Sequence, residues 1–379
     1  MPRSASGRAE PVDHPPFRIA TFNAGLAVGV LPHALERLPH VVSALATLDV
    51  ELFFVQEVWL DPHWEQLREA ASARFPHSFR AAPAQPARHG VCSKEEVEPL
   101  VACARAHCNG LESEELARCV IQRCSRAAAT LSPECLNCVA SNPLGSLDEI
   151  IAPCVASAEE GKAAAGGRGA SGSSGRHSYY GVPGLVAYGG SFGTGLLSAV
   201  PLLDRDELVY ESTLNARGAL YARVEAAGLG EVHVFATHLS PGPYDEQRPQ
   251  VERLLAWVEA KAGPRGRAVI VGDLNTGPSL HGGGRTHSSG LYGMFEEAGF
   301  RNPYTAMPDA SATFCDGSFS SAGHGTSGWL LDHVLLRGFP EQASGKRLLD
   351  EPLTIEAGGR RVRTTYSDHC GVLVTIGGR

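Results

Sequence analysis

Three features are missing from this 379-residue sequence. It has no uninterrupted apolar run of about 18 residues, the minimum for a membrane-spanning helix, so we expect no transmembrane span. It has no basic excess, since 33 Lys and Arg face 41 Asp and Glu, and the net charge of −8 argues against non-specific nucleic-acid binding. The opening MPRSASGRAEPVDHPP lacks the apolar core of a secretory signal, so we expect a disordered leader over residues 1–16.

Ten cysteines are present, and eight of them fall between Cys92 and Cys154. Their abundance favours an extracellular or periplasmic location, where disulfides persist. The absence of a signal peptide favours the cytoplasm instead. The sequence therefore leaves the compartment open.

Short apolar runs dominate the rest of the chain, and 43% of its residues are hydrophobic, as in an ordinary globular protein. We expect strands at 17–23, 51–59, 77–81, 184–188, 194–199, 219–225, 231–238, 268–272, 330–336 and 369–376, and helices at 39–48, 61–75, 245–262 and 289–298. Pro39 would open the first helix, and Asp61 would cap the second. Many strands with few helices argue against a regular parallel βαβ barrel and favour two stacked sheets with helices outside.

The pattern breaks between 83 and 178. We expect a cysteine-rich helical insert at 83–156 and a Gly/Ser/Ala-rich flexible linker at 157–178. The two flanking segments, 17–82 and 179–379, would together form one domain.

Cysteine spacing in the insert is nearly periodic, because several pairs are sixteen residues apart. A helical hairpin that turns at Asn109-Gly110 would let Cys108 meet Cys119 and Cys103 meet Cys124. Eight cysteines allow 105 connectivities, so this pairing is a hypothesis. Zinc is the alternative, because the two cysteines of C135-x-x-C138 have ligand spacing. We favour disulfides, since small modules need covalent staples.

Polar residues stand at the ends of several apolar runs. They are Asn23, Glu57, His238, Asp273 with Asn275, Asp332, and Asp368 with His369. Each one alone is more readily explained as a turn or a structural residue. So many breaks of the same kind suggest instead that strand ends gather these side chains at one edge of a sandwich.

Clustered carboxylates need a cation. Two unit charges 4 Å apart repel by about 4 kcal/mol at an effective dielectric near 20. Glu57, Asp273 and Asp368 could share a site only around a hard ion, so we expect Mg²⁺, with Mn²⁺ or Ca²⁺ as alternatives. His369 suits acid–base work, and a hydrogen bond from its ring to Asp332 would fix its tautomer.

Seven stretches in this order resemble motifs of the endonuclease/exonuclease/phosphatase superfamily, the fold of pancreatic deoxyribonuclease. They are TFNAG, QEVW, GTGLLSAVPL, ATHLSPG, GDLNTGP, LDHVLL and YSDHCGV, between residues 17 and 376. The resemblance implies an α/β four-layer sandwich, in which two packed mixed β-sheets are flanked by helices, and a metal-dependent phosphoric ester hydrolase.

The resemblance also implies roles for the residues. Glu57 and Asp368 would be metal ligands, and Asn23 would bind substrate. His238 would stabilise phosphate oxygens, while Asp273 and Asn275 would position the nucleophile and the phosphate. Asp332 would orient His369, the general base.

The stretches RGALYARV (217–224) and ATFCDGSFSSAGHGTSGWLLDHVLL (312–336) resemble neutral sphingomyelinase-like members. We therefore expect a phosphodiesterase that acts on a phospholipid or sphingolipid head group, with transient membrane-surface contact. Arg217 would contact the phosphate, although a lone arginine before glycine is more often a surface residue. The alternatives are a secreted or periplasmic nuclease, a phosphoinositide-type phosphatase, and a binding protein on an inactive hydrolase scaffold. We expect a monomer, and the insert's partner is unknown.

Overall fold

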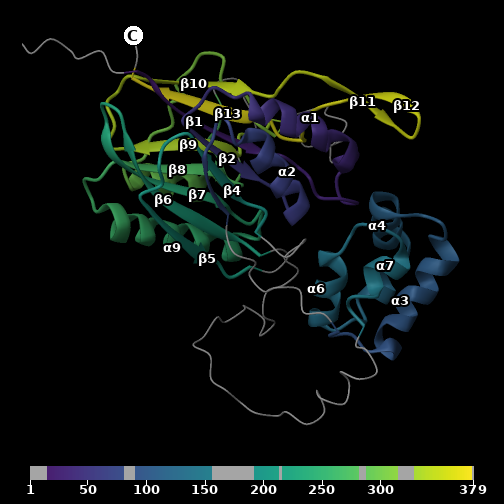
Figure 1. Cartoon of the computed structure of the whole chain (residues 1–379). Coiled ribbons are helices and arrows are strands. Elements are labelled where there is room, and N and C mark those ends of the chain that lie inside the picture. The colour runs from purple at the N-terminus through teal and green to yellow at the C-terminus, as the bar shows by residue number, and fades with distance from the viewer. Residues whose placement is uncertain are drawn as a thin grey trace, which may run out of the picture.

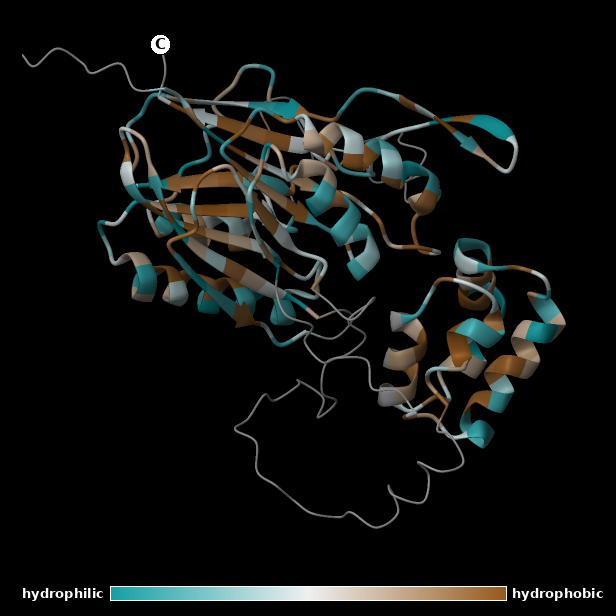
Figure 2. Cartoon of the chain, in the orientation of Figure 1, coloured by the Kyte–Doolittle hydropathy of each residue, from teal (hydrophilic) through white to brown (hydrophobic). Residues whose placement is uncertain are grey.

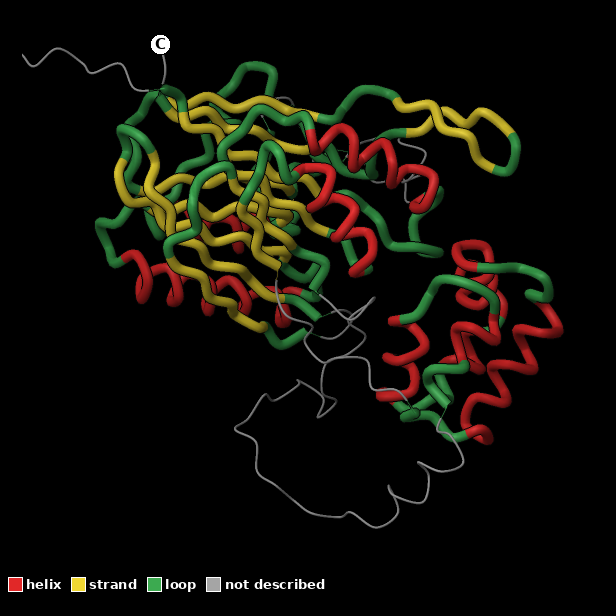
Figure 3. Tube along the Cα trace, viewed as in Figure 1, coloured by secondary structure: helices red, strands yellow, loops and turns green. Residues whose placement is uncertain are grey.

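Two mixed β-sheets form the centre of the protein, as the tube in Figure 3 shows. The structure, a computed structural model, describes residues 15–80, 90–155, 192–212, 216–280, 287–314 and 328–377. The six-stranded sheet has the order β10 (Ala343–Leu348), β13 (Gly371–Ile376), β1 (Phe17–Asn23), β2 (Leu52–Gln56), β4 (Gly195–Ser198) and β3 (His77–Arg80). The five-stranded sheet has the order β5 (Asp204–Val209), β6 (Gly218–Ala226), β7 (Gly230–His238), β8 (Ala268–Asp273) and β9 (Asp332–Arg337).

Helices cover both outer faces of the stacked sheets (Figure 1). Helices α1 (Ala34–Ala46) and α2 (Asp61–Ala71) pack on the six-stranded sheet, and α9 (Tyr244–Ala262) and α10 (Ser289–Glu297) pack on the five-stranded sheet. The apolar core between the sheets includes Ile19, Phe54, Val234, Val271 and Val374. Figure 2 shows this layer as the hydrophobic stripes of the strands. The four-layer α/β sandwich is therefore confirmed.

Strand direction explains where the polar residues gather. The pairs β1–β2 and β7–β8 are the parallel pairs of the two sheets, and each pair ends at the same edge. Asn23 lies opposite Gln56, and His238 lies opposite Asp273. The antiparallel strand β9 begins at Asp332, opposite Asp273. Strand β13 runs antiparallel to β1, so it begins beside the end of β1. The ends of β1, β2, β7 and β8 and the beginnings of β9 and β13 therefore lie along one edge of the stacked sheets, which we call the rim.

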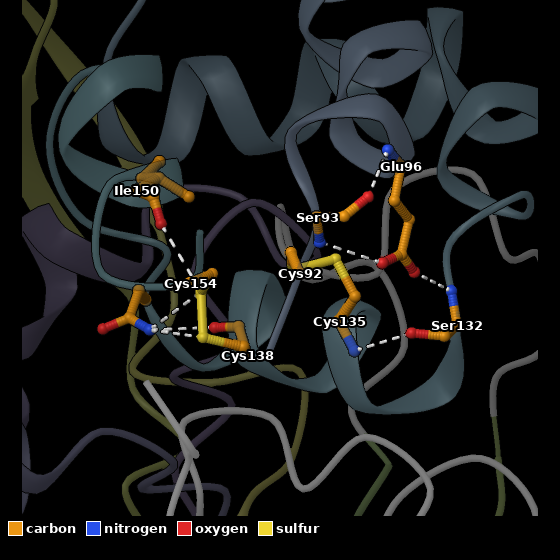
Figure 4. The surroundings of a disulfide bond; sticks show 9 residues. Cys92, Ser93, Glu96, Ser132, Cys135, Cys138, Ile150 and Cys154 are labelled. Atoms are coloured by element: carbon orange, nitrogen blue, oxygen red, sulfur yellow. Dashed lines mark hydrogen bonds between the residues drawn. A yellow bond between two sulfur atoms is a disulfide. The ribbon is translucent and has the colours of Figure 1, made fainter. Parts of the chain in front are cut away.

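The cysteine-rich insert forms a helical unit with its own apolar core. It contains α3 (Lys94–His107), α4 (Ser113–Arg123), α5 (Ser125–Ala128), α6 (Pro133–Ser141) and α7 (Leu147–Ile151). Disulfides join Cys108 to Cys119 and Cys103 to Cys124, which confirms the predicted hairpin pairing. Two further disulfides, Cys92–Cys135 and Cys138–Cys154, are drawn in Figure 4. Both cysteines of the CxxC stretch are therefore in disulfides, and the zinc alternative is wrong.

Side-chain hydrogen bonds reinforce the staples in Figure 4. Ser93 and Glu96 form a reciprocal capping box at the start of α3. The second oxygen of Glu96 accepts the backbone N–H of Ser132, at the start of α6. Caps and disulfides together hold short helices whose core is too small to do so alone.

Two helix starts differ from the sequence prediction. Helix α1 begins at Ala34, so Pro39 lies inside it rather than at its first position. Proline there lacks the N–H that would otherwise donate to a carbonyl of the preceding turn. Helix α2 takes Leu60 as its N-cap, and Asp61 is its first residue, paired with Arg80 at 3.3 Å.

A separate antiparallel hairpin, β11 (Leu353–Ala357) with β12 (Arg360–Thr364), extends beyond α1 (Figure 1). Cys370, at the start of β13, is disulfide-bonded, so it is not the plain core thiol that its apolar context suggested. No described helix combines the length and the apolar character of a membrane span. The predicted leader up to residue 14, the linker at 157–178 and the strand at 184–188 lie outside the described residues.

Candidate active site

The amide of Asn23 joins the two sheets at the shared rim. Its Nδ2 donates to Oε1 of Glu57 at 3.1 Å and to Oδ2 of Asp273 at 3.0 Å. Its Oδ1 accepts the backbone N–H of Gly25 at 3.1 Å. Asn23 is fully buried, so this one side chain fixes two carboxylates from two different sheets. The structure thereby brings three of the predicted residues, Asn23, Glu57 and Asp273, together.

Two of the predicted residues sit in a strained backbone conformation. Glu57 has φ 57° and Asn275 has φ 48°, both in the left-handed region that non-glycine residues rarely occupy. Such strain persists only where surrounding contacts enforce it, and it is common at functional sites. The backbone N–H of Asn275 donates to Oδ1 of Asp273 at 2.9 Å, and its side-chain Nδ2 donates to the Leu239 carbonyl at 2.9 Å.

A buried Asp–His–Asp array crosses the rim. Nδ1 of His369 lies 2.8 Å from Oδ2 of Asp332, and Nε2 lies 3.8 Å from Oδ2 of Asp273. Burial alone would lower the pKa of His369, but the charges of Asp332 and Asp273 raise it well above the ordinary value. Burial raises the pKa of Asp332 to about 6, although His369 acts in the opposite direction. The ring is thus oriented by one carboxylate and faces another.

Asp273 is held as a carboxylate. Burial by itself would raise its pKa, but His369 and His238, with the hydrogen bond from Asn23, bring the pKa far below the ordinary value. Nε2 of His238 lies 3.3 Å from Oδ2 of Asp273. Burial and the positive charge of Arg217 lower the pKa of His238. The two histidines beside Asp273 therefore differ in their pKa shifts: the pKa of His369 is raised and the pKa of His238 is lowered.

Arg217 lies inside the protein and not on its surface, so the alternative reading of this residue is wrong. Its relative exposure is 6%, and its guanidinium lies over the ring of Trp59, 5.9 Å from the centroid. Burial lowers its pKa, while the negative charges of Glu57 and Asp273 act to raise it. Its Nη1 is buried without a hydrogen-bond partner in the part of the chain that the structure describes.

Asp368 reaches the rim because Gly25 leaves room for it. A Cβ at Gly25 would lie 2.7 Å from Oγ of Ser367 and 2.9 Å from Oδ1 of Asp368. Gly25 also has φ 55°, which favours glycine. Ser367 Oγ donates to Oδ1 of Asp368 at 3.0 Å and accepts the backbone N–H of His369 at 3.2 Å. The first loop and the last motif are therefore in direct contact.

The donor set at the rim fits a hard divalent cation. Glu57 and Asp273 accept from the same amide, so two carboxylates from different sheets are adjacent. Atoms of Asp273, Asp332 and His369 that could ligate a metal lie within 4.8 Å of one another. Asp332 is hydrogen-bonded to His369, and Asp273 accepts hydrogen bonds from Asn23 and from the backbone of Asn275. All-oxygen carboxylate donors of this kind suit Mg²⁺.

Sequence reasoning missed an aromatic wall beside His369. The ring of Phe314 meets His369 edge-on with centroids 5.1 Å apart, and Trp329 lies 6.1 Å from Phe314. His287 packs on Trp329 at 4.8 Å. The only sequence signal was Trp329 itself, three residues before Asp332, and a lone tryptophan before a strand normally indicates core.

One protein family matches more than half of this chain. A model of the Endonuclease/Exonuclease/phosphatase family matches residues 139–369, more than half of the chain. The chain belongs to this family, whose members are typically metal-dependent phosphoesterases. The matched segment contains His238, Asp273, Asp332 and His369. No match was found among curated proteins.

Solved structures share the fold at low sequence identity. Sphingomyelinase C from Streptomyces griseocarneus is 16% identical with a TM-score of 0.53, over 96% of this chain and 100% of that chain. A mutant beta toxin from Staphylococcus aureus with bound magnesium ions is 11% identical with a TM-score of 0.54, over 97% and 100%. D. rerio TDP2, complexed with a single-stranded DNA product, is 12% identical with a TM-score of 0.52, over 96% and 99%.

Proposed function

We propose that this protein is a divalent-metal-dependent phosphodiesterase that acts on a phospholipid or sphingolipid head group. The observation that carries the hydrolase part is the buried array in which His369 lies between Asp332 and Asp273. A histidine held by one carboxylate and aimed at another is arranged to take a proton from a bound water. Asn23 and Arg217 lie around the same carboxylates.

Each residue at the rim has a separate proposed role in in-line hydrolysis. Glu57 and Asp368 would hold a divalent ion, which when bound polarises a phosphoryl oxygen and stabilises the leaving oxygen. Asp332 keeps Nδ1 of His369 protonated, so in the neutral ring Nε2 is the atom that accepts the proton from water. Because the nearby carboxylates raise the pKa of His369, the rate should increase as the pH rises through that pKa. Asp273, on the Nε2 side of the ring, orients that water.

Charge that builds up on the phosphoryl oxygens needs donors fixed in advance. Asn275 and Arg217 supply them, and His238 does so when its ring is protonated; all three are nearly fully buried. The unpartnered Nη1 of Arg217 supports its role, since a buried N–H without an acceptor is costly and a phosphate oxygen would satisfy it.

Arg217→Met should therefore lower kcat/KM by about 10- to 100-fold, the value of a charge-assisted hydrogen bond to the substrate. Steady-state kinetics on a soluble phosphodiester would measure it. Arg205→Met is the matched control, because Arg205 is exposed on the neighbouring strand β5. An unchanged kcat/KM in the Arg217 variant would remove this residue from the substrate site.

A lipid head group is the substrate class we favour. The net charge of −8 gives the protein no general attraction for the nucleic-acid backbone. Two of the solved structures with this fold are a sphingomyelinase C and a beta toxin. The aromatic wall of Phe314 and Trp329 beside His369 suits a quaternary ammonium, which binds aromatic faces.

Nuclease activity is the second candidate, because aromatic faces also stack nucleobases and the TDP2 structure with this fold carries a DNA product. A substrate panel separates the two. The purified protein with Mg²⁺ is incubated with sphingomyelin vesicles, phosphoinositide vesicles, plasmid DNA, RNA and bis(p-nitrophenyl) phosphate. We expect cleavage of the generic diester and release of phosphocholine from sphingomyelin.

A catalytically disabled variant, His369→Ala, is run beside the wild type so that contaminating nuclease is recognised. Cleavage of DNA without lipid would replace the lipid assignment by the nuclease. Phosphate release from phosphoinositide alone would favour the phosphatase. No cleavage of any substrate, with Mg²⁺ shown to bind, would favour a binding protein on an inactive scaffold.

A further inference from the structure

Helix α1 begins without a capping side chain of its own. Its N-cap residue His33 has φ 58° and makes no side-chain cap hydrogen bond. The first N–H groups of a helix have no partner within the helix and need an acceptor from elsewhere. That acceptor is Glu114 of α4, in the cysteine-rich insert. Its Oε1 accepts the N–H of His33 at 2.8 Å, and its Oε2 accepts that of Leu35 at 3.5 Å.

The contact between α4 and the segment before α1 is close and buried. Glu114 is 6% exposed and also pairs with Arg118 at 2.6 Å. A Cβ at Gly29 would lie 2.4 Å from Cβ of Ala117, so only glycine allows this approach. In Figure 1, α4 is the helix of the insert nearest to the purple segment that leads into α1. The insert thus docks on the catalytic sandwich through a carboxylate rather than through an apolar face alone.

Arg37, in the first two turns of α1, connects the start of this helix to the loops that follow Asn23 and precede Asp368. It is fully buried, and its guanidinium donates to four backbone carbonyls, those of Pro32, Ala24, Gly25 and Tyr366. Ala24 and Gly25 directly follow Asn23, and Tyr366 lies two residues before Asp368. The negative charges that act on the buried Arg37 include those of Asp368, Glu114 and Glu57.

The loop that Arg37 holds is also bonded to the end of β2. The N–H of Ala24 donates to the Gln56 carbonyl at 2.9 Å, and the N–H of Leu26 donates to the Glu57 carbonyl at 3.1 Å. A shift of Arg37 would therefore reach the backbone at Asn23, at Glu57 and at Asp368. Two of these segments present the proposed metal ligands Glu57 and Asp368, and the third presents Asn23, whose amide is bonded to Glu57.

We propose that the cysteine-rich insert is a working part of the active site, and that Glu114 is a positioning residue. Glu114 caps α1 and so holds Arg37, which in turn fixes the loops that carry Asn23, Glu57 and Asp368. The catalytic consequence rests on the proposed phosphodiesterase function, whereas the mechanical coupling does not.

The experiment compares Glu114→Ala with Glu115→Ala, a neighbouring and exposed glutamate on the same helix. Loss of the cap should lower kcat on bis(p-nitrophenyl) phosphate and raise the half-saturating Mg²⁺ concentration. A change of about fivefold in each is expected if the free energy typically lost with a cap is transmitted to the site. Amide hydrogen exchange at 24–26 and 366–369 should accelerate by a similar factor. Glu114→Gln keeps one acceptor oxygen and should recover part of both effects.

A merely structural role would lower the melting temperature and leave kcat and the Mg²⁺ requirement, measured far below that temperature, unchanged. That outcome would overturn the proposal, as would unaltered exchange at 24–26. Exchange is read without substrate, so the coupling is tested even if the wild type hydrolyses no phosphodiester, a result that would count against the proposed function alone.

A second pair of variants guards against misfolding of Glu114→Ala. Gly29→Ala would push α4 away through its contact with Ala117, and Ala117→Gly would restore space in the double variant. Recovery of kcat and of exchange protection in the double variant supports docking of the insert as the cause. Backbone strain at position 29 is the same in the single and the double variant. A double variant that is no more active and no better protected than Gly29→Ala alone would therefore contradict the proposal.

Discussion

Replacing His369 with alanine should lower kcat by about 10³-fold, the contribution of a well-placed general base. The imidazole is hydrogen-bonded to Asp332 through Nδ1 at 2.8 Å, and its Nε2 lies 3.8 Å from Asp273, so it is the side chain oriented to accept the proton there. Steady-state kinetics on a soluble phosphodiester would measure the loss. KM should change little, because the proposed phosphate contacts, Arg217 and Asn275, remain.

The alanine variant leaves Asp332 buried without its partner, so its stability has to be measured alongside its activity. His369→Asn provides a second test, because its amide can still donate to Asp332 but cannot accept a proton from water. His40→Ala, an exposed histidine on α1, is the matched control and should retain wild-type activity. Wild-type turnover in both His369 variants would remove His369 from the proposed mechanism.

Removing divalent metal should abolish activity. An excess of EDTA is expected to lower the rate by at least about 10³-fold, because the carboxylates of Glu57, Asp273 and Asp368 would then repel an anionic phosphate. Addition of Mg²⁺ above the chelator should restore the rate. The fold should survive chelation, since the apolar core between the sheets includes no metal ligand.

A variant separates the metal site from a general salt effect. Glu57→Gln should raise the Mg²⁺ concentration needed for half-maximal rate, whereas Glu65→Gln, exposed on α2, should leave it unchanged. Full activity in excess chelator would refute the metal requirement and, with it, the assignment of Glu57.

Much of the fold follows from the sequence because the signals are local and repeated. The all-buried strand β8, AVIVGD, and the β-branched strand β13, GVLVTI, have a composition that suits stacked sheets. The pairing of Cys108 with Cys119 followed from a hairpin turn at Asn109-Gly110 between helical segments. In each case the decisive partners are close in the chain, or the pattern is long enough to exclude alternatives.

The candidate site was anticipated as a set of strand-end residues, and the structure does bring Asn23, Glu57 and Asp273 together. Their chemical roles remain proposals. What the sequence could not give is the environment of Arg217, because burial of one arginine depends on Trp59 and on carboxylates far along the chain. The start of α1 was misplaced for the same reason, since the acceptor for its first N–H groups lies 81 residues away in Glu114.

The hydrogen bonds from Asn23 to Asp273 and from His369 to Asp332 each tie one sheet to the other. Their lengths therefore depend on how far apart the interior side chains keep the two layers. A bulkier or smaller residue at a position such as Val271 or Val374, remote from any phosphate, would tilt the layers and misalign donor and acceptor. The size of the apolar side chains between the two sheets should therefore affect the reaction rate as well as the stability of the fold.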